Sequence, residues 1–237
     1  MSSPLDWLGI ELNVVSKREK LVSAVGGLLS ILFLMAISRG GLHLPYNIGL
    51  VASMGASAVL LFAVPHGQLS QPWPVLGGHC LAATIGVACA KWIGPTEWAG
   101  ACAVAMTIGV MHQLKCIHPP GGATALTAVL GGPAVRDLGF HYVFCPVFAN
   151  CLVMIGTAIV FNSFFGWRRY PAAWSRKTEL AVGSTAPSHE EIVEALRQLD
   201  SFVDISEENL VSLVRIIHDG SRHPVPKAAA NSLRVHS

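Results

Sequence analysis

The stretch KCIHPPGGATALTAVLGGP, residues Lys115–Pro133, decides the fold, because it interrupts a very apolar chain with helix-breaking residues. It holds a proline pair, two glycine pairs, a lysine, a cysteine and a histidine. Such residues interrupt helical hydrogen bonds, and a backbone N–H or C=O group without a hydrogen-bond partner is costly in lipid. The run from Pro120 to Leu130 is about 11 residues, too short to span a bilayer, so it predicts a half-helix.

The surrounding sequence predicts a membrane-embedded block with polar ends. Of 237 residues, 52% are hydrophobic and 13% are charged, whereas soluble domains carry roughly 25% charged residues. The few charged residues between Leu21 and Phe165 are Arg39, Lys91, Glu97, Lys115, Arg136 and Asp137. We therefore expect an all-α, polytopic helical bundle in a lipid bilayer. The net charge is only +2, and the sequence shows no cluster of basic and aromatic residues of the kind that binds nucleic acid. We therefore expect no nucleic-acid partner.

Apolar runs predict about six membrane segments, with the half-helix counted among them. They are Leu21–Ser38, roughly Asn47–Val64, roughly Gly78–Ile93, Trp98 to about Leu114, Pro120–Leu130, and His141–Phe165. The proline-rich residues from Pro65 to Gly78 indicate a loop.

Basic residues flank the block at both ends. They are Lys17, Arg18 and Lys20 before it, and Arg168, Arg169, Arg176 and Lys177 after it. The positive-inside rule then places both termini in the cytoplasm, which requires an even number of crossings. Residues 1–20 form a polar, cytoplasmic leader, and the first apolar run indicates a retained anchor rather than a cleaved signal peptide.

Two stretches of the block resemble each other. Both MGASAVLLFAVP (Met54–Pro65) and GGATALTAVLGGP (Gly121–Pro133) have Gly-Ala-Ser/Thr-Ala, then aliphatic residues and a proline. This pattern predicts two three-segment units, 21–93 and 98–165, of which the second is inverted, as in transporters built around broken helices. Chance similarity of two Gly/Ala-rich helices is the alternative.

The first turn of the half-helix predicts an anion-binding site. Pro120 suits the first helical position, and the N–H groups that follow it lack partners within the helix. The helix dipole favours an anion there by roughly 0.3–2 kcal/mol. The candidate residues are His118, Pro119, Pro120, Gly121, Gly122, Ala123 and Thr124, with Ser53, Gly55, Ala56 and Ser57 in the first unit. Close packing of small residues between membrane helices is the alternative.

Histidines in or beside apolar segments offer a second chemistry. They are His43, His79, His112, His118 and His141. A proton relay through His112 or His118 is one hypothesis, since imidazole titrates near physiological pH. His112 and Cys116, four residues apart on one helix face, leave a metal site as an alternative. We expect neither a metal nor another cofactor.

The C-terminal part predicts a separate element. SHEEIVEALRQLDSFVD begins with a capping box of Ser188 and Glu191, and SEENLVSLVRIIHDG ends at Gly220. Residues 188–220 therefore indicate a cytoplasmic αα-hairpin, too small to bury a core alone. Residues 221–237 indicate a disordered tail.

The run IHPPGGATAL at Ile117–Leu126 resembles the HPP family of integral membrane proteins. The upstream GASAVLLFAVP and the tail SHEEIVEALRQLDSFVDISEENLVSLV are also similar to members of that family, the tail to bacterial ones. The resemblance covers about residues 17–217, with a transmembrane domain at 21–167. It implies an integral protein of the bacterial inner membrane, and chloroplast relatives are associated with nitrite transport. His118 to Gly122 match the motif, for which the family supplies no settled role.

The leading hypothesis is a transporter or channel for a small inorganic anion, with nitrite as the first candidate. A non-transporting membrane sensor or scaffold, signalling through the C-terminal hairpin, is the alternative. The chain carries no nucleophile elbow, P-loop or dinucleotide-binding loop, so we do not expect an enzyme. Small-residue helices and the hairpin suit a homodimer or a higher oligomer.

Overall fold

The computed structural model describes residues 15–40 and 51–174, and within them every regular element is a helix. The elements are α2 (Lys17–Gly40), α4 (Ser53–Ala63), α5 (Pro72–Trp92), α6 (Thr96–Gln113), α7 (Pro120–Leu130), α8 (Gly132–Leu138) and α9 (Ala149–Ser163), with short turns of helix at Gln68–Ser70, Val143–Phe148 and Ala172–Trp174. The all-α class is confirmed for this part of the chain. The predicted hairpin at 188–220, the tail at 221–237 and most of the leader lie outside the described residues.

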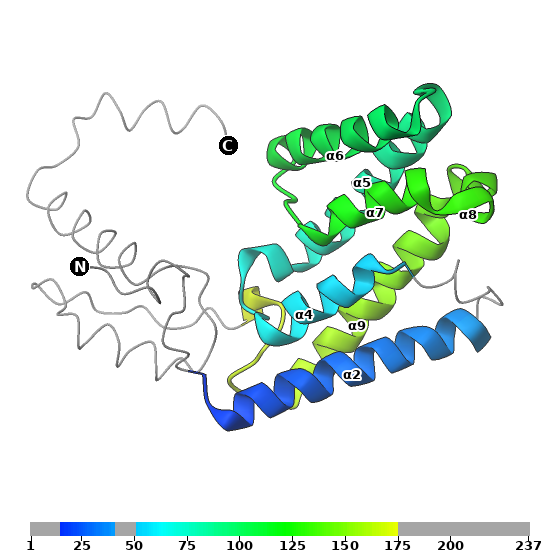
Figure 1. The fold of residues 1–237 in the computed structure, drawn as a ribbon. Helices are drawn as coiled ribbons and strands as arrows, with labels where there is room; N and C mark the ends of the chain where they lie inside the picture. The colour runs from blue at the N-terminus through cyan, green and yellow to red at the C-terminus, as the bar shows by residue number, and fades with distance from the viewer. Residues whose placement is uncertain (1–14, 41–50, 175–237) are drawn as a thin grey trace, which may run out of the picture. The chain divides into compact units, whose positions relative to one another are not determined.

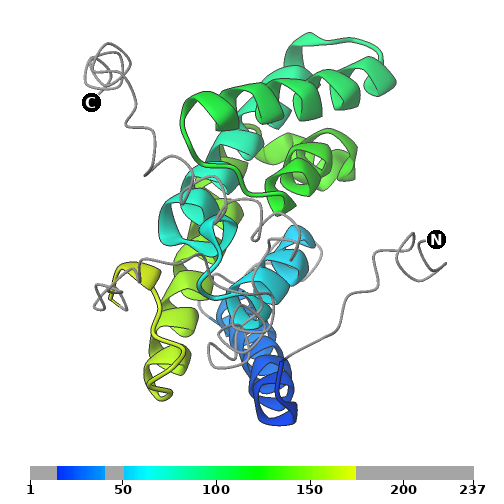
Figure 2. The ribbon, with the colours of Figure 1, turned by 90° about the vertical axis from the view of Figure 1, so that its left-hand side faces the viewer.

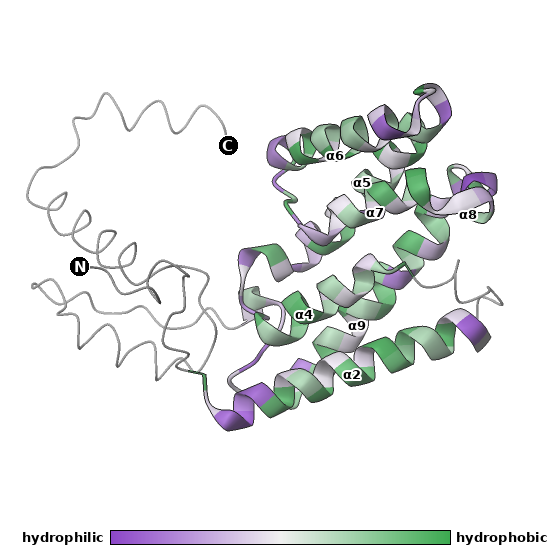
Figure 3. Ribbon diagram, viewed as in Figure 1, coloured by the Kyte–Doolittle hydropathy of each residue, from purple (hydrophilic) through white to green (hydrophobic). Residues whose placement is uncertain are grey.

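Several helices have the length and composition of membrane segments. Among the described residues, three are long and apolar enough to cross a membrane: Lys17–Arg39, Pro72–Trp92 and Val143–Ser163. α4 and α7 are apolar but shorter, with 11 residues each. Figure 3 shows apolar residues along the middle of the helices and hydrophilic residues gathered at their ends and in α8. The distribution is that of a membrane protein.

The predicted half-helix is confirmed, since α7 begins at Pro120 and ends at Leu130. Pro120 occupies the first turn, where its missing N–H costs nothing. Gly131 closes the helix by donating its N–H to the carbonyl of Thr127 at 2.8 Å. At about 1.5 Å per residue, such a helix covers only about half of the hydrocarbon core.

The third segment begins earlier than the sequence predicted. α5 starts at Pro72 rather than near Gly78, so the predicted loop is wrong over its last residues. Gln71 precedes the helix in an extended conformation, and its amide donates to the carbonyls of Pro65 at 3.1 Å and Gly67 at 2.8 Å. A proline in the first helical turn needs no N–H donor, so the proline-rich run begins a helix here.

The last segment, predicted as one helix from His141 to Phe165, is interrupted. Val143–Phe148 forms a wide π-type turn with Pro146 inside it and Cys145 in an extended conformation (φ −139°, ψ 115°). Proline cannot donate to the helix ladder and its ring crowds the preceding turn. The regular helix α9 therefore starts only at Ala149.

The helices of the described part form two groups. α5, α6 and α7 contact one another, and so do α2, α4 and α9. In Figures 1 and 2, α6, α7, α4 and α2 follow one another across one face, with α5 behind the first pair and α9 behind the second. Contacts of α4 with α7 and of α5 with α9 join the two groups. The two half-helices thus lie next to each other at the centre of the arrangement.

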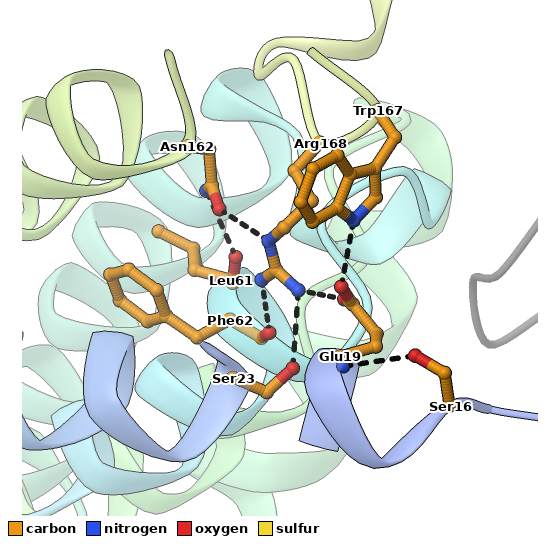
Figure 4. Close-up of polar contacts among 8 residues, drawn as sticks. All are labelled: Ser16, Glu19, Ser23, Leu61, Phe62, Asn162, Trp167 and Arg168. Carbon is orange, nitrogen blue, oxygen red and sulfur yellow. Dashed lines mark hydrogen bonds and ion pairs between the residues drawn. The ribbon is translucent and has the colours of Figure 1, made fainter. Parts of the chain in front are cut away.

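A buried ion pair joins the two ends of the helical block (Figure 4). Arg168, after α9, pairs with Glu19 in the first turn of α2, and both are almost fully buried. Arg168 also donates to the Asn162 side chain at 3.1 Å, the Ser23 hydroxyl at 3.2 Å and the Phe62 carbonyl at 2.5 Å. The block therefore begins and ends on the same side of the bundle.

Candidate functional site

Five buried polar side chains lie where α4, α5 and α7 meet. Ser53 and Ser57 belong to α4, His79 to α5, Thr124 to α7, and His118 to the connection before α7. Ser53 is 3% exposed and the other four are fully buried. We call these five residues the hydroxyl–imidazole chain. Polar groups at membrane depth are expensive, and they mark functional positions more often than structural ones.

The five side chains are linked by a continuous series of hydrogen bonds. The distances are 2.7 Å from Ser53 Oγ to Thr124 Oγ1, 2.7 Å from Thr124 Oγ1 to His79 Nδ1, 2.8 Å from His79 Nε2 to Ser57 Oγ, and 2.9 Å from Ser57 Oγ to His118 Nε2. The series ends at the carbonyl of Leu69, 2.8 Å from His118 Nδ1. The two imidazole rings meet edge to face, with centroids 4.8 Å apart.

The arrangement follows from helix geometry. Ser53 and Ser57 are four residues apart, so both lie on one face of α4. Ser53, at the start of α4, bonds to Thr124 inside α7. Ser57, about one turn later in α4, bonds to His118, which precedes α7, so the two chains run in opposite directions here. The first turns of the two half-helices are thus side by side and antiparallel, which brings both positive dipole ends close to the chain.

Glycines on α5 allow the close approach that these bonds need. A Cβ atom at Gly78 would lie 2.7 Å from the Cβ of His118. About two turns beyond His79, a Cβ at Gly86 would lie 2.6 Å from the carbonyl oxygen of Ala125 on α7. A side chain at either position would push α5 away from the α7 region. The spacing that joins His79 to Thr124 therefore depends on glycine.

The backbone at the two helix starts differs from the prediction. The N–H groups expected to lack partners are already bonded in short turns: Gly121 to the His118 carbonyl at 2.8 Å, Gly122 to Pro119 at 3.0 Å, Met54 to Val51 at 2.9 Å and Gly55 to Ala52 at 3.1 Å. The reason is that Pro119 and Ala52 already have α-helical dihedral angles and extend each helix backward.

A pocket of about 300 Å³ opens beside the hydroxyl–imidazole chain, at the start of α7. Its walls are formed by Val104, Thr107, Ile108, Met111, His112, Ile117, His118, Pro119 and Gly122. Thr107 is fully buried, and its hydroxyl has no hydrogen-bond partner among the described residues. A buried hydroxyl without a partner costs about 1–3 kcal/mol, so the Thr107 hydroxyl is available to bond to a molecule in the pocket.

The residues predicted from the sequence fall into three groups. Ser53, Ser57, His118 and Thr124 are members of the hydroxyl–imidazole chain, and Pro119 and Gly122 line the pocket. Pro120 and Gly121 are buried in the first turn of α7. Gly55, Ala56 and Ala123 lie on exposed helix faces outside both features.

The predicted relay and metal residues lie differently from expectation. His112 is exposed and reaches the pocket but is not part of the bonded chain. α6 ends at Gln113, and Lys115 follows with φ 54°, so His112 and Cys116 do not share a helix face. Within the described residues no group of three or more His, Cys, Asp or Glu side chains could hold a metal ion.

The sequence analysis named His79 among the histidines of the apolar segments but did not place it in the site, and it missed Thr107. Both lie inside apolar helices, α5 and α6, and their partners or neighbours come from distant parts of the chain. The only local signal was a histidine in the middle of a membrane-spanning helix, which is itself a mark of function.

Helices of spanning length, two central half-helices and a buried polar chain define a polytopic α-helical membrane protein. The chain belongs to the HPP family, because the model of the HPP transmembrane region matches residues 12–171. Two transmembrane proteins of Dictyostelium discoideum are similar to it, one 44% identical over 132 residues and the other 41% identical over 129 residues. These matches cover 54% and 53% of this chain, but only 42% and 45% of the two relatives. No solved structure matches the chain significantly.

Proposed function

We propose that this protein carries a small inorganic anion across the membrane, with nitrite as the first candidate. The observation that carries the proposal is the meeting of two helix N-termini at a buried cluster of uncharged donors. Each N-terminus contributes a partial positive charge, and the polar side chains around the two N-termini carry no formal charge when both imidazoles are neutral. Such a site favours an anion over a cation and releases it more readily than a fixed arginine or lysine would.

The pocket beside this cluster is the proposed binding site. The Thr107 hydroxyl supplies a donor that bonds to none of the described residues, and His118 connects the pocket to the hydroxyl–imidazole chain. The volume of about 300 Å³ is ample for a triatomic anion with part of its hydration shell. The choice of nitrite rests on the resemblance to a family whose chloroplast members are associated with nitrite transport.

An inverted repeat is part of this proposal. The order long helix, half-helix, long helix occurs twice, as α2, α4, α5 and as α6, α7, α9. Corresponding helices run in opposite directions in Figure 1, and the contact of α2 with α9 corresponds to that of α6 with α5. An approximate twofold axis would then pass between α4 and α7, where the hydroxyl–imidazole chain lies. Sites at such axes are typical of transporters.

The proposed orientation places both ends of the block in the cytoplasm. Lys17, Arg18 and Lys20 lie on the same side of the bundle as Arg169. This common basic side agrees with the positive-inside rule.

Uptake of nitrite into proteoliposomes tests the proposal, with Gly122→Leu as the decisive variant. A Cβ at Gly122 meets no atom within 4 Å, so leucine would fill the pocket without displacing protein. Uptake is expected to fall at least about tenfold, the equivalent of ~1.4 kcal/mol of binding energy. His118→Ala is expected to lower it as well. Gly109→Leu is the matched control, since Gly109 is also open but lies outside the pocket. Unchanged uptake in Gly122→Leu would show that the pocket is not on the transport path.

The Thr107→Val variant tests whether the Thr107 hydroxyl binds the anion or only supports the fold. Valine keeps the shape of threonine, and removing a buried hydroxyl without a partner is expected to leave the thermal stability unchanged or higher. The apparent affinity for nitrite is expected to fall about tenfold, because a hydrogen bond to a charged group contributes about 1.5–3 kcal/mol. Initial uptake rates over a range of nitrite concentrations measure this, together with thermal unfolding in detergent. Lower stability with unchanged affinity would contradict the assignment.

A further inference from the structure

We propose that the hydroxyl–imidazole chain takes up one proton with each transported anion, so that the protein moves the anion and H⁺ as a neutral pair. This inference rests on the proposed anion transport and adds that the transport is coupled to a proton. It is carried by the directions of the hydrogen bonds, which the geometry determines.

The direction is set at the Leu69 end. A carbonyl oxygen only accepts, so Nδ1 of His118 carries a hydrogen and donates it to Leu69. In neutral imidazole the other nitrogen then accepts, so the Ser57 hydroxyl donates to Nε2 of His118. Ser57 has a single hydrogen, which is now used. It must therefore accept from Nε2–H of His79.

The remaining two bonds follow in the same way. With its hydrogen on Nε2, His79 accepts at Nδ1, and Thr124 donates to it. Thr124 in turn accepts the hydroxyl hydrogen of Ser53. Five hydrogens thus occupy five bonds, and every bond points from Ser53 toward Leu69. With both histidines neutral, this is the one arrangement that satisfies all five bonds.

The same side chains can hold one additional proton, because the backbone offers other acceptors. If His118 carries hydrogens on both nitrogens, Ser57 accepts from both rings and its own hydrogen turns to the carbonyl of Ser53, 3.3 Å away. If His79 carries both, the Thr124 hydroxyl turns to the carbonyl of Pro120 at 3.5 Å, a longer contact. A small rotation of one hydroxyl therefore separates the neutral and protonated states.

The hydroxyl–imidazole chain cannot hold a second additional proton. Two charged imidazoles with centroids 4.8 Å apart would repel each other in a medium of low dielectric constant. Both would also be buried near the positive ends of α4 and α7. The chain is thus limited to one extra proton.

Binding of an anion changes this balance. A lone imidazolium beside two helix N-termini is unfavourable, but an anion in the pocket that His118 lines would offset its charge. Coupling is reciprocal, so the proton strengthens anion binding as much as the anion strengthens protonation. The empty and doubly loaded states are both close to neutral, and each can be exposed to either side of the membrane at lower cost than a singly charged state.

Other titratable groups near the two histidines are few. α4 and α7 contain none, since their sequences hold only apolar residues, serine and threonine. Those on neighbouring elements are His66 in the connection that holds Leu69, Cys80, Cys89 and Lys91 on α5, Glu97, Cys102 and His112 on α6, Lys115 and Cys116 in the connection to α7, and Cys151 on α9. His66 is not a member of the hydrogen-bonded series that joins His79 and His118. His112 and Lys115 are exposed, and the cysteine thiols are neutral groups, so the proton is assigned to His79 and His118.

Nitrite uptake by purified full-length protein in proteoliposomes tests the coupling. With the membrane potential held at zero by potassium and valinomycin, nitrite accumulation is expected to rise about tenfold per unit of inward pH gradient, as for one proton per anion. A membrane potential without a pH gradient is expected to have no effect on nitrite accumulation. A pH dye inside the vesicles is expected to report acidification with nitrite entry. Protein-free vesicles correct for diffusion of nitrous acid.

The Ser57→Ala variant tests whether the hydroxyl–imidazole chain links the proton to the anion, because it removes the hydroxyl between the two imidazoles. The nitrite uptake that remains in Ser57→Ala is expected not to respond to the pH gradient. Ser57→Thr restores a hydroxyl and is expected to restore the response. His141→Gln is the control, since this histidine is exposed and lies outside the chain. If Ser57→Ala fails to fold, calorimetry of nitrite binding to the wild type in buffers of different ionisation enthalpy is expected to show uptake of one proton per anion.

The outcomes separate the two proposals. Wild-type uptake that follows the membrane potential and ignores the pH gradient would overturn the coupling and leave anion transport standing. A pH response that persists in Ser57→Ala, or binding without proton uptake, would overturn the role of the chain. Absence of any protein-dependent nitrite uptake would overturn the proposed function itself, and the coupling with it.

Discussion

Replacing Arg168 with methionine is expected to lower the free energy of unfolding by about 3–5 kcal/mol, because it leaves the buried carboxylate of Glu19 without its cation. The side chains of Arg168 and Glu19 are 1% and 4% exposed, so water cannot take the place of the lost partner. The guanidinium also loses its bonds to Asn162, Ser23 and Phe62. Thermal unfolding in detergent, with Arg169→Met as the control at an exposed neighbouring position, measures the effect.

A second variant separates loss of the ion pair from loss of packing. Adding Glu19→Gln to Arg168→Met removes the uncompensated charge, and Trp167 can still donate to the new side chain from its present 2.9 Å. We expect the double variant to be more stable than Arg168→Met alone. If the two unfold at the same temperature, the charge of Glu19 is not the main cost, and the contacts of the guanidinium with α4 and α9 carry the stabilisation.

Much of the fold could be predicted, because in a membrane the pattern of apolar runs and breakers leaves few alternatives. The all-α class, the half-helix at Pro120–Leu130 and the family followed from the sequence and are confirmed. The start of α5 and the break at Pro146 did not follow. A proline begins a helix at Pro72 and disrupts one at Pro146, and its local sequence does not say which.

The site was harder to predict, because its parts are far apart in the chain. Ser57 bonds to His79, 22 residues away, and to His118, 61 residues away. Helical periodicity places Ser53 and Ser57 on one face, but it does not say which helix that face meets. The role of His79 depends on the tertiary fold, and so do the short turns that satisfy the N–H groups of Gly121 and Gly122.

Gly86→Ala is expected to abolish protein-dependent nitrite uptake, because it separates the two helices that hold the site. The added methyl carbon would lie 2.6 Å from the carbonyl oxygen of Ala125 and 2.8 Å from the Cβ of Ala128. Both atoms are fixed to the backbone of α7, so neither can rotate aside, and the helices must move apart. Overpacking of this kind costs about 1–3 kcal/mol.

The loss of transport should exceed the loss of stability, and the comparison of the two is the test. The bond between His79 on α5 and Thr124 on α7 is 2.7 Å long and crosses the widened contact, so moving the two helices apart by more than about 0.5 Å takes it beyond hydrogen-bond distance and breaks the hydroxyl–imidazole chain. Gly156→Ala is the matched control, because a Cβ there meets no atom within 4 Å and alanine favours the helix by about 1 kcal/mol. Uptake and thermal unfolding are measured on both variants. A folded Gly86→Ala protein that still transports nitrite would show that transport does not depend on the α5–α7 spacing, and the site would then have to lie elsewhere in the bundle.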